Sequence, residues 1–177
     1  PSEVARKAEV IITCLLDSKV FESIITGRDG ILDVIRHGQI YIDSTTNFPP
    51  SSFKMASLIK KKGAAMLDAP VSGGAVKAQN GALSIMVGGD KNIFEQCLPI
   101  FNAIGKKITH IGSAVGDGGY AKLANQIMVA INLTAMGEAF SFAKRIGLNQ
   151  QKLFAALSGG LANSEVLKVK IDRLLKN

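Results

Sequence analysis

The chain changes its pattern once, between residues 112 and 118, and this change constrains the fold more than any other feature. Before it, short apolar runs rich in β-branched residues alternate with amphipathic stretches, the pattern of a parallel sheet with crossover helices. After it the strand pattern stops and only helices are indicated. We therefore expect an α/β fold, with a doubly wound sheet in residues 1–114 followed by an all-α part in residues 115–177.

Individual elements follow from the same pattern. Strands are predicted at residues 10–16, 40–43, 64–71, 83–87 and 107–111. A helix is predicted from the Pro49-Pro50 pair to Lys62, because proline favours a helix start and Gly63 stands just past the end. Further helices are predicted at residues 91–104, 120–146, 150–157 and 164–175. The helix at 120–146 is apolar on nearly all sides, so we expect it to be buried.

Composition argues against several classes of partner. The 177 residues carry a formal net charge of +7. The lysines are scattered, ending in a run from Lys168 to Lys176, and no aromatic residues interleave with them, so we expect no nucleic-acid binding. The longest uncharged run, 123–137, is shorter than the roughly 18 residues of a membrane span, so we expect no membrane association. No secretory leader is indicated, which favours a cytoplasmic location.

Cysteines and histidines point away from disulfides and metals. Cys14 and Cys97 lie far apart and are expected to be buried free thiols, in agreement with a reducing compartment. His37 and His110 stand alone without ligand-like spacing, so we expect no metal site.

A glycine-rich segment opens the predicted long helix. Residues 116–121, Gly-Asp-Gly-Gly-Tyr-Ala, fit the dinucleotide pattern G-x-G-x-x-A. In that motif the helix ends and a second strand carries an acidic residue about 20 positions on. Here Glu138 stands near that distance but inside an unbroken helical pattern. We interpret the segment as a hinge that starts the helix and lets it approach a ligand closely.

The first candidate binding site is Ser72-Gly73-Gly74, just past the third predicted strand. Open α/β sheets bind ligands beyond the carboxyl ends of their strands. Adjacent glycines let backbone N–H groups face an anion, and the Ser72 hydroxyl adds a donor, which suits a carboxylate. The alternative is an ordinary glycine turn.

The second candidate site is formed by Lys122, Asn125 and Gln126 at the start of the long helix. Spacings of three and four place a cation and two amides on one helix face, where they can converge on a small polar ligand. The positive end of the helix dipole disfavours an ammonium ion, which would help Lys122 act as an acid–base group. An exposed first turn is the alternative.

These segments resemble one family. Residues 68–89 and 116–126 resemble, in the expected order, the substrate signature and the catalytic-lysine segment of the β-hydroxyacid dehydrogenases. Residues 43–46, Asp-Ser-Thr-Thr, resemble the family's D-x-[ST]-[ST] turn near the nicotinamide. Residues 14–17 resemble its cofactor-contacting strand end, where Leu16 replaces the usual proline. Within the family, residues 122–126 and 159–164 look most like the branch that reduces tartronate semialdehyde.

The resemblance implies a fold, a cofactor and a reaction. The fold would be part of a Rossmann-like domain followed by the start of an all-α domain of the 6-phosphogluconate dehydrogenase type. The cofactor would be NAD or NADP, and the reaction would be reduction of a short 3-oxo acid, such as tartronate semialdehyde, to its hydroxy acid, or the reverse. A homo-oligomer would form through the long helix.

The resemblance also implies roles for individual residues. Lys122 would be the catalytic proton donor or acceptor, and Thr46, Leu15 and Leu16 would contact the cofactor. Five residues would bind the small carboxylate substrate: Ser72, Gly73, Gly74, Asn125 and Gln126.

Family members begin with a βαβ unit that carries the glycine fingerprint, and they continue into more helices. We therefore expect this chain to be part of a longer enzyme and to be inactive alone. Two alternatives stay open at this point: an activity of the 3-hydroxyisobutyrate dehydrogenase type, and a non-catalytic assembly module that lacks the cofactor fingerprint and keeps the long helix for dimerisation.

Overall fold

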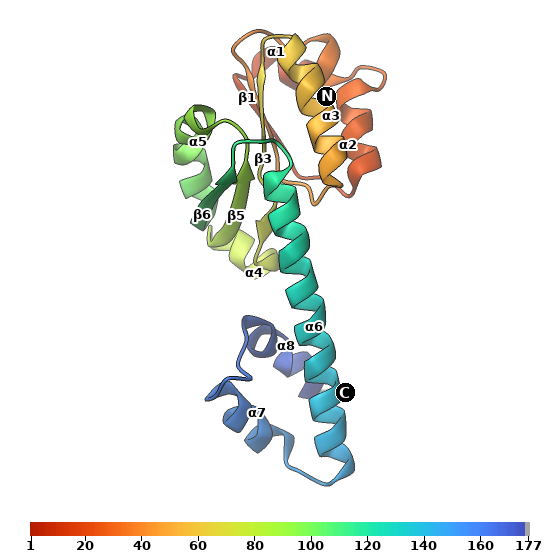
Figure 1. The fold of residues 1–177 in the computed structure, drawn as a ribbon, viewed down its shortest axis with the longest axis vertical. Coiled ribbons are helices and arrows are strands. Elements are labelled where there is room, and N and C mark those ends of the chain that lie inside the picture. Colours follow the sequence, from red (N-terminus) through yellow and green to blue (C-terminus); the bar gives the residue numbers. More distant parts are fainter. Residues whose placement is uncertain (176–177) are drawn as a thin grey trace. The chain divides into compact units, whose positions relative to one another are not determined.

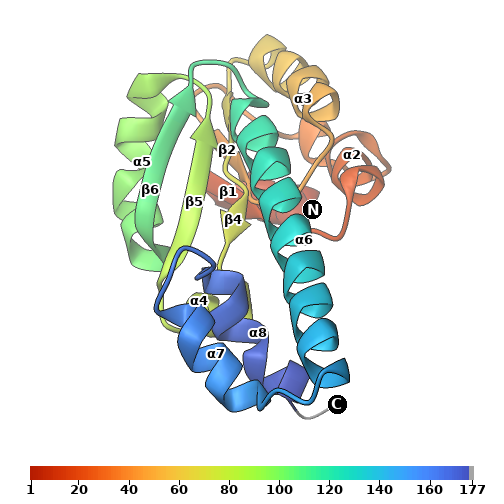
Figure 2. The same cartoon turned by 60° about the horizontal axis from the view of Figure 1, so that its bottom comes forward.

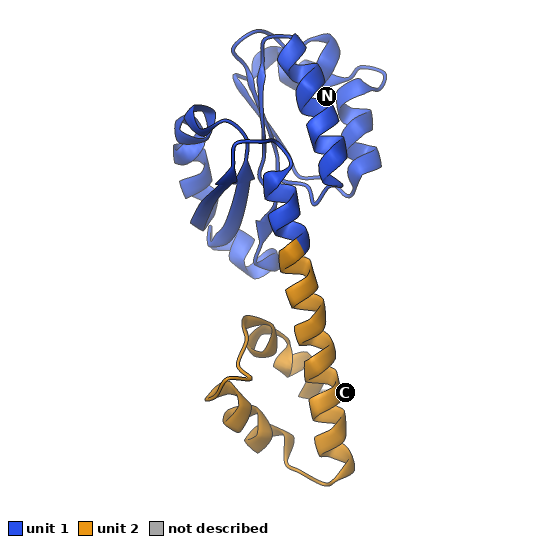
Figure 3. Cartoon of the chain, viewed as in Figure 1, with its two compact units in different colours: residues 1–123 blue, residues 124–177 orange. Residues whose placement is uncertain are grey.

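The computed structural model describes residues 1–175 of the chain. Lys176, the last residue of the basic run noted above, lies outside the described residues. The chain forms two compact units, Pro1–Leu123 and Ala124–Asn177 (Figure 3).

The first unit is built from short strands and helices. In chain order they are α1 (Ser2–Lys7), β1 (Val10–Thr13), α2 (Ser18–Thr26), the 3-10 helix η1 (Ile31–Asp33), β2 (Ile40–Asp43), α3 (Pro49–Lys61), β3 (Ala65–Asp68), β4 (Val71–Ser72), α4 (Gly74–Gln79), β5 (Leu83–Gly88), α5 (Lys91–Ile104) and β6 (Gly105–Gly112). The long helix α6 (Asp117–Arg145) begins in the first unit and continues into the second, which also holds α7 (Gln150–Ser158) and α8 (Glu165–Leu175).

Helices cover both faces of a single sheet. In both views α2 and α3 lie on one side of the sheet and α5 on the other (Figures 1 and 2). On the α2 and α3 side, Phe21, Ile25 and Ile59 pack against Tyr41 of β2. On the α5 side, Cys97 and Phe101 pack against Ile42 and Ile85. The two faces of each strand therefore bury different residues, which confirms the α/β class.

The sheet is mixed, although the sequence pattern predicted a parallel one. Strands β1, β2 and β3 are parallel and in register, as expected. β5 is antiparallel to both β3 and β4, whereas β6 is parallel to β5. The reason is the connection between β3 and β5, which turns back through β4 to form an antiparallel pair, Val71 with Ile85 and Ser72 with Ser84. The β5–β6 connection through α5 is a crossover, so that pair is parallel.

The predicted third strand, residues 64–71, is in fact two strands. β3 ends at Asp68 and β4 begins at Val71. Ala69 still donates its backbone N–H to Asp43 O at 2.7 Å, but Pro70 has no N–H to give and its carbonyl accepts from Met86 at 3.1 Å. The chain therefore changes strand partner at the proline.

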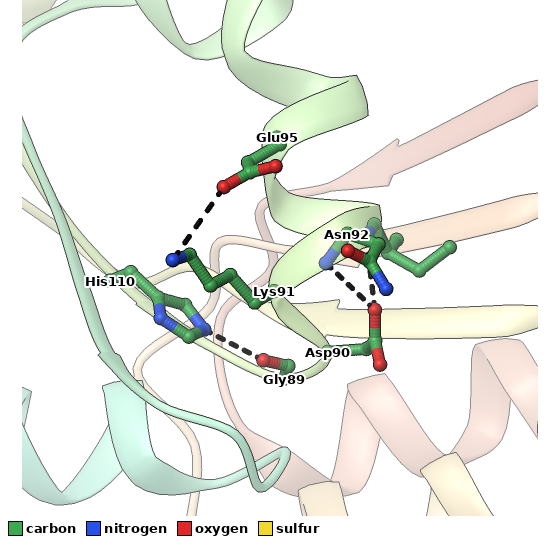
Figure 4. Close-up of polar contacts among 7 residues, drawn as sticks. Gly89, Asp90, Lys91, Asn92, Glu95 and His110 are labelled. Atoms are coloured by element: carbon green, nitrogen blue, oxygen red, sulfur yellow. Dashed lines mark hydrogen bonds and ion pairs between the residues drawn. The ribbon is translucent and has the colours of Figure 1, made fainter.

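Several predicted boundaries are confirmed because their local signals are strong. β2 and α5 have the predicted bounds. Figure 4 shows why α5 begins at Lys91: the Asp90 side chain accepts from the backbone N–H groups of Asn92 at 2.8 Å and Ile93 at 3.1 Å. An i,i+4 pair follows, with Lys91 Nζ 3.8 Å from Glu95 Oε1. Nearby, His110 Nε2 hydrogen-bonds Gly89 O at 2.8 Å, so this histidine links β6 to the end of β5.

The prediction that both cysteines are buried is wrong for one of them. Cys97 of α5 is buried, whereas Cys14 is exposed. The physical reason is that β1 ends at Thr13 and not at Leu16, which leaves Cys14 in the loop that follows the strand. Both thiols are free.

The second unit is helical, and its long helix is less buried than predicted. Phe140 of α6 packs with Leu167 and Ile171 of α8 in a small core. Other apolar side chains of α6 are 60–63% exposed, namely Ile127, Met128, Ile131 and Phe142. The prediction of a buried helix is therefore wrong for this chain by itself, because one three-helix unit covers only one side of a helix that is apolar nearly all round. Within residues 1–175 no helix is both long and apolar enough to span a bilayer.

Candidate active site

The three parallel strands end together. Thr13, Asp43 and Asp68 occupy the last paired positions of β1, β2 and β3. The carboxyl ends of parallel strands in an open α/β sheet are where ligands bind. Two aspartates, 1% and 2% exposed, lie at this edge of the sheet. The loops that follow these strands are therefore the place to look for a cofactor and a substrate.

Asp43 organises the loop after its own strand. Its Oδ1 accepts from the hydroxyls of Thr13 at 2.8 Å and Thr45 at 2.7 Å, and its Oδ2 accepts from the Asn47 amide. Burial raises the pKa of Asp43, and the hydrogen bonds from Thr45, Thr13 and Asn47 oppose that rise by favouring the carboxylate. The β2 loop is thereby held in one conformation.

The predicted cofactor-contacting residues lie at this edge. Leu15 follows β1, and its backbone N–H donates to Thr45 Oγ1 at 2.9 Å, so the β1 and β2 loops are tied together. Leu16 is 87% exposed and Thr46 is exposed. Leu16 lies in the loop between β1 and α2, and its exposed side chain offers an apolar surface that a flat ring can cover. These residues therefore fit a nicotinamide cofactor, although their contacts with it stay predictions.

Asp68 reaches the glycine-rich segment that opens α6. Its Oδ1 accepts from Gly116 N at 2.7 Å and its Oδ2 from Gly119 N at 2.6 Å. Burial raises the pKa of Asp68 to about 6, while these two bonds act in the opposite direction. The unbroken helix after the glycines is confirmed. The close neighbours that these glycines admit include the carboxylate of Asp68, which accepts from Gly116 and Gly119, and Met86 O, which a Cβ at Gly118 would approach to 2.4 Å.

Lys122 lies one turn further along α6. It is 7% exposed, and burial lowers the pKa of its ammonium group. None of the ion pairs found within residues 1–175 includes Lys122. A buried lysine with a lowered pKa at the edge of an α/β sheet is a candidate acid–base group.

Ser72-Gly73-Gly74 lies where the chain passes from β4 into α4. Ser72 pairs with Ser84, four positions before Gly88, which pairs with Asp68, so Ser72 lies beyond the carboxyl end of β3. Gly74 has φ +66°, and a Cβ placed there would meet no described atom within 4 Å. Space for a ligand next to this backbone is therefore open.

Asn125 and Gln126 follow Lys122 in the same helix but belong to the second unit. The Nδ2 of Asn125 lies 3.4 Å from Oε1 of Gln126. Gln126 is exposed and Asn125 is half-buried. Their substrate-binding role stays a prediction.

The sequence did not predict a role for two buried polar side chains at the site, those of Asp68 and Asn47. Asp68 stood inside the recognised segment, but its partners are 48 and 51 residues away. Asn47 is 4% exposed, and its Oδ1 is a buried acceptor without a partner among residues 1–175. For Asn47 the sequence offered no signal beyond its place after the Asp-Ser-Thr-Thr turn.

Comparisons with known proteins define the family to which this chain belongs. The profile described as the NAD binding domain of 6-phosphogluconate dehydrogenase matches residues 1–112. The profile described as NAD-binding of NADP-dependent 3-hydroxyisobutyrate dehydrogenase matches residues 116–177. Both describe NAD-binding domains, which confirms NAD or NADP as the cofactor class.

Individual relatives are hydroxyacid dehydrogenases and reductases. The chain is 37% identical over 174 residues to 2-hydroxy-3-oxopropionate reductase of Escherichia coli, covering 98% of this chain and 59% of that protein. It is 37% identical over 158 residues to mitochondrial 3-hydroxyisobutyrate dehydrogenase of Rattus norvegicus, covering 89% and 47%. The solved 3-hydroxyisobutyrate dehydrogenase of Mycobacterium tuberculosis with L-serine superposes with a TM-score of 0.83 at 33% identity, covering 93% and 55%.

The chain therefore belongs to the family of NAD(P)-dependent β-hydroxyacid dehydrogenases, as the resemblance predicted. It spans about three-fifths of the length of the Escherichia coli relative and about half that of the rat relative.

Proposed function

We propose that this protein is an NAD(P)-dependent oxidoreductase that interconverts a short 3-oxo acid and its hydroxy acid, with tartronate semialdehyde and glycerate as the preferred pair. The observation that carries the proposal is Lys122, a buried lysine with a lowered pKa at the start of α6. We further propose that residues 1–114 serve the nucleotide cofactor and that residues 115–177 serve the substrate and assembly.

The bound nicotinamide supplies a hydride acceptor or donor. In the direction of reduction, the ammonium of Lys122 donates a proton to the oxygen of the carbonyl that is being reduced; in the direction of oxidation, its neutral amine removes the hydroxyl proton. Burial lowers the pKa of Lys122 and so reduces the free energy needed to form the neutral amine near neutral pH.

The substrate carboxylate would be held by the Ser72 hydroxyl and the backbone N–H groups of Gly73 and Gly74. Gly73 has φ +138° and Gly74 φ +66°, conformations that side-chain-bearing residues rarely adopt. Asn125 and Gln126 would orient the substrate relative to Lys122. Leu15, Leu16 and Thr46 would line the place of the nicotinamide at the ends of β1 and β2.

The exposed apolar side chains of α6, Ile127, Met128 and Ile131 among them, support assembly into a homo-oligomer through this helix. The mass of the full-length protein in solution, measured by light scattering, tests this part. Charged substitutions at Ile127 and Ile131 are expected to shift the mass towards that of one chain.

The experiment that tests the activity is an assay of the full-length protein with tartronate semialdehyde and with methylmalonate semialdehyde, each with NADH and NADPH. Faster turnover of tartronate semialdehyde is the expected result. Faster turnover of methylmalonate semialdehyde would move the assignment to the 3-hydroxyisobutyrate type. No turnover of either would favour the assembly module.

A further inference from the structure

One carboxylate holds the start of the helix that carries Lys122. Asp68 is 2% exposed, and each of its two oxygens accepts a backbone N–H from a different residue, Gly116 before the helix and Gly119 in its first turn. The two bonds, 2.7 and 2.6 Å long, fix two points of the chain relative to the end of β3. Two fixed points determine both the place and the direction of the first turn.

The same first turn rests directly on strand backbone. A Cβ at Gly118 would lie 2.4 Å from Met86 O and 2.9 Å from Asp68 O, so only glycine allows this approach. A Cβ at Gly88 would lie 2.4 Å from Asp68 Oδ1 and 2.7 Å from Gly118 N. The helix start is therefore set by Asp68 and by contacts that no side chain can enter.

Lys122 follows Gly119 by three residues, which places the two on the same face of α6, one turn apart. If the first turn of α6 moves at Gly119, Lys122 therefore moves with it, because one rigid turn of helix joins the two residues. Asp117, the acidic residue of the same turn, does not replace Asp68, since its Oδ2 accepts from Ala114 N at 3.0 Å in the preceding loop.

We propose that Asp68 is a positioning residue for Lys122: by binding Gly116 and Gly119 it keeps the first turn of α6 against the end of β3 and so keeps the lysine amine in its buried place. The proposal rests on the proposed function only in giving Lys122 the proton transfer. Asparagine cannot take over this role, because one of its two polar atoms is a donor and would face an N–H group.

The test uses the full-length protein and two variants that disturb the helix start in different ways. Asp68→Asn removes one acceptor, and Gly118→Ala inserts a methyl group between the helix and the strand backbone without changing any charge. Asp117→Asn is the control for removing a carboxylate from the same turn. Gly137→Ala is the control for the glycine substitution, since a Cβ there meets no described atom within 4 Å in the same helix.

The first readout is independent of activity. The reactivity of each lysine with an acylating reagent, measured by mass spectrometry across pH, gives the pH midpoint of Lys122. In Gly118→Ala, which changes no charge, we expect this midpoint to rise by on the order of one pH unit, because a displaced lysine regains water. In Asp68→Asn we expect a smaller rise, because losing the nearby negative charge opposes the gain from water. Asp117→Asn is expected to leave the midpoint unchanged or to lower it, because losing a nearby negative charge disfavours the ammonium ion.

The second readout is steady-state kinetics. Because a misplaced catalytic group typically costs up to about 100-fold in rate, we expect kcat to fall roughly 10- to 100-fold in Asp68→Asn and Gly118→Ala, with KM for the cofactor within about twofold. A merely destabilising change would lower the amount of active protein without moving the Lys122 midpoint. If either variant is folded by circular dichroism and leaves both midpoint and kcat unchanged, the proposal is overturned.

Failure of the two ideas can be told apart. If the wild-type protein turns over no 3-oxo acid with either cofactor, the proposed function fails, while the Lys122 midpoints still decide whether Asp68 positions the lysine. If turnover is normal and the midpoints do not move, only the positioning role fails.

Discussion

β2 and β3 both end in a buried aspartate, but the two carboxylates bind different partners. Asp43 and Asp68 are register partners on neighbouring strands, both are buried, and burial raises the pKa of both. Asp43 accepts mainly from side chains, whereas Asp68 accepts from two backbone N–H groups of the glycine-rich segment before and within α6. One aspartate thus orders its neighbouring loops, and the other fixes the helix that carries the candidate catalytic lysine.

The largest effect on activity is expected from replacing Lys122, which lies in the helix that Asp68 at the end of β3 holds. Lys122→Ala should lower kcat in the reduction of a 3-oxo acid by on the order of 10²- to 10⁴-fold, because general acid catalysis is lost. Lys107→Ala is the matched control, since Lys107 is an exposed lysine of β6. Kinetics of both variants, with circular dichroism to confirm folding, provide the measurement. A loss of less than about tenfold in Lys122→Ala would remove the lysine from the mechanism.

Replacing Asp68 by alanine should lower the free energy of unfolding more than replacing Asp43 by alanine. Asp68→Ala leaves two buried backbone N–H groups that cannot rotate towards another acceptor, so we expect the free energy of unfolding to fall by roughly 3–4 kcal/mol. Asp43→Ala frees hydroxyls of Thr13 and Thr45 that can turn to new partners, so roughly 1–2 kcal/mol is expected. Chemical denaturation of both variants measures the difference, and equal losses would erase the contrast between the two aspartates.

The pH dependence of stability should contain a contribution from Asp68. Its pKa in the folded protein, about 6, lies above the ordinary 3.8, so the folded state binds more protons than the unfolded state between these values. The free energy of unfolding should therefore fall as pH rises from about 4 to about 6, by at most roughly 3 kcal/mol from this group. Denaturation of Asp68→Asn, which cannot titrate there, should show a smaller fall. A larger fall in the variant would reverse the assigned sign.

The smallest expected effect is on the KM for the substrate when Ser72, beyond the end of β3, is replaced. Ser72→Ala should raise KM for the 3-oxo acid about tenfold, because one hydrogen bond to the carboxylate is lost, with little change in KM for the cofactor. Ser84→Ala, on the strand partner of Ser72, is the control. A change confined to the KM of the cofactor would reassign Ser72 to the cofactor site.

Local signals in the sequence were enough for part of the fold. The bounds of β2 and α5 could be predicted because a β-rich run, an aspartate cap and a closing glycine coincide with them. The direction of β5 could not, since it depends on the turn back through β4 and on pairing with residues far along the chain. The exposure of Ile127 and Met128 was also missed, because apolarity predicts burial without saying which surface provides it.

At the candidate site, too, the sequence predicted some features and missed those that depend on tertiary contacts. Lys122 could be selected from its place at the helix start and from the family resemblance, but its burial depends on tertiary packing. The two bonds of Asp68 join residues about 50 positions apart, a relation that neither periodicity nor spacing carries. Sequence reasoning therefore identified the proton-transfer candidate and missed what holds it in place.

The most direct test of the account is the pH dependence of kcat/KM in both directions for the full-length protein and for Lys122→Ala. The account predicts that reduction slows and oxidation speeds up as pH rises through the pKa of Lys122, which lies below its ordinary value, and that Lys122→Ala lacks both changes. Retention of the same two pH dependences in Lys122→Ala would contradict it.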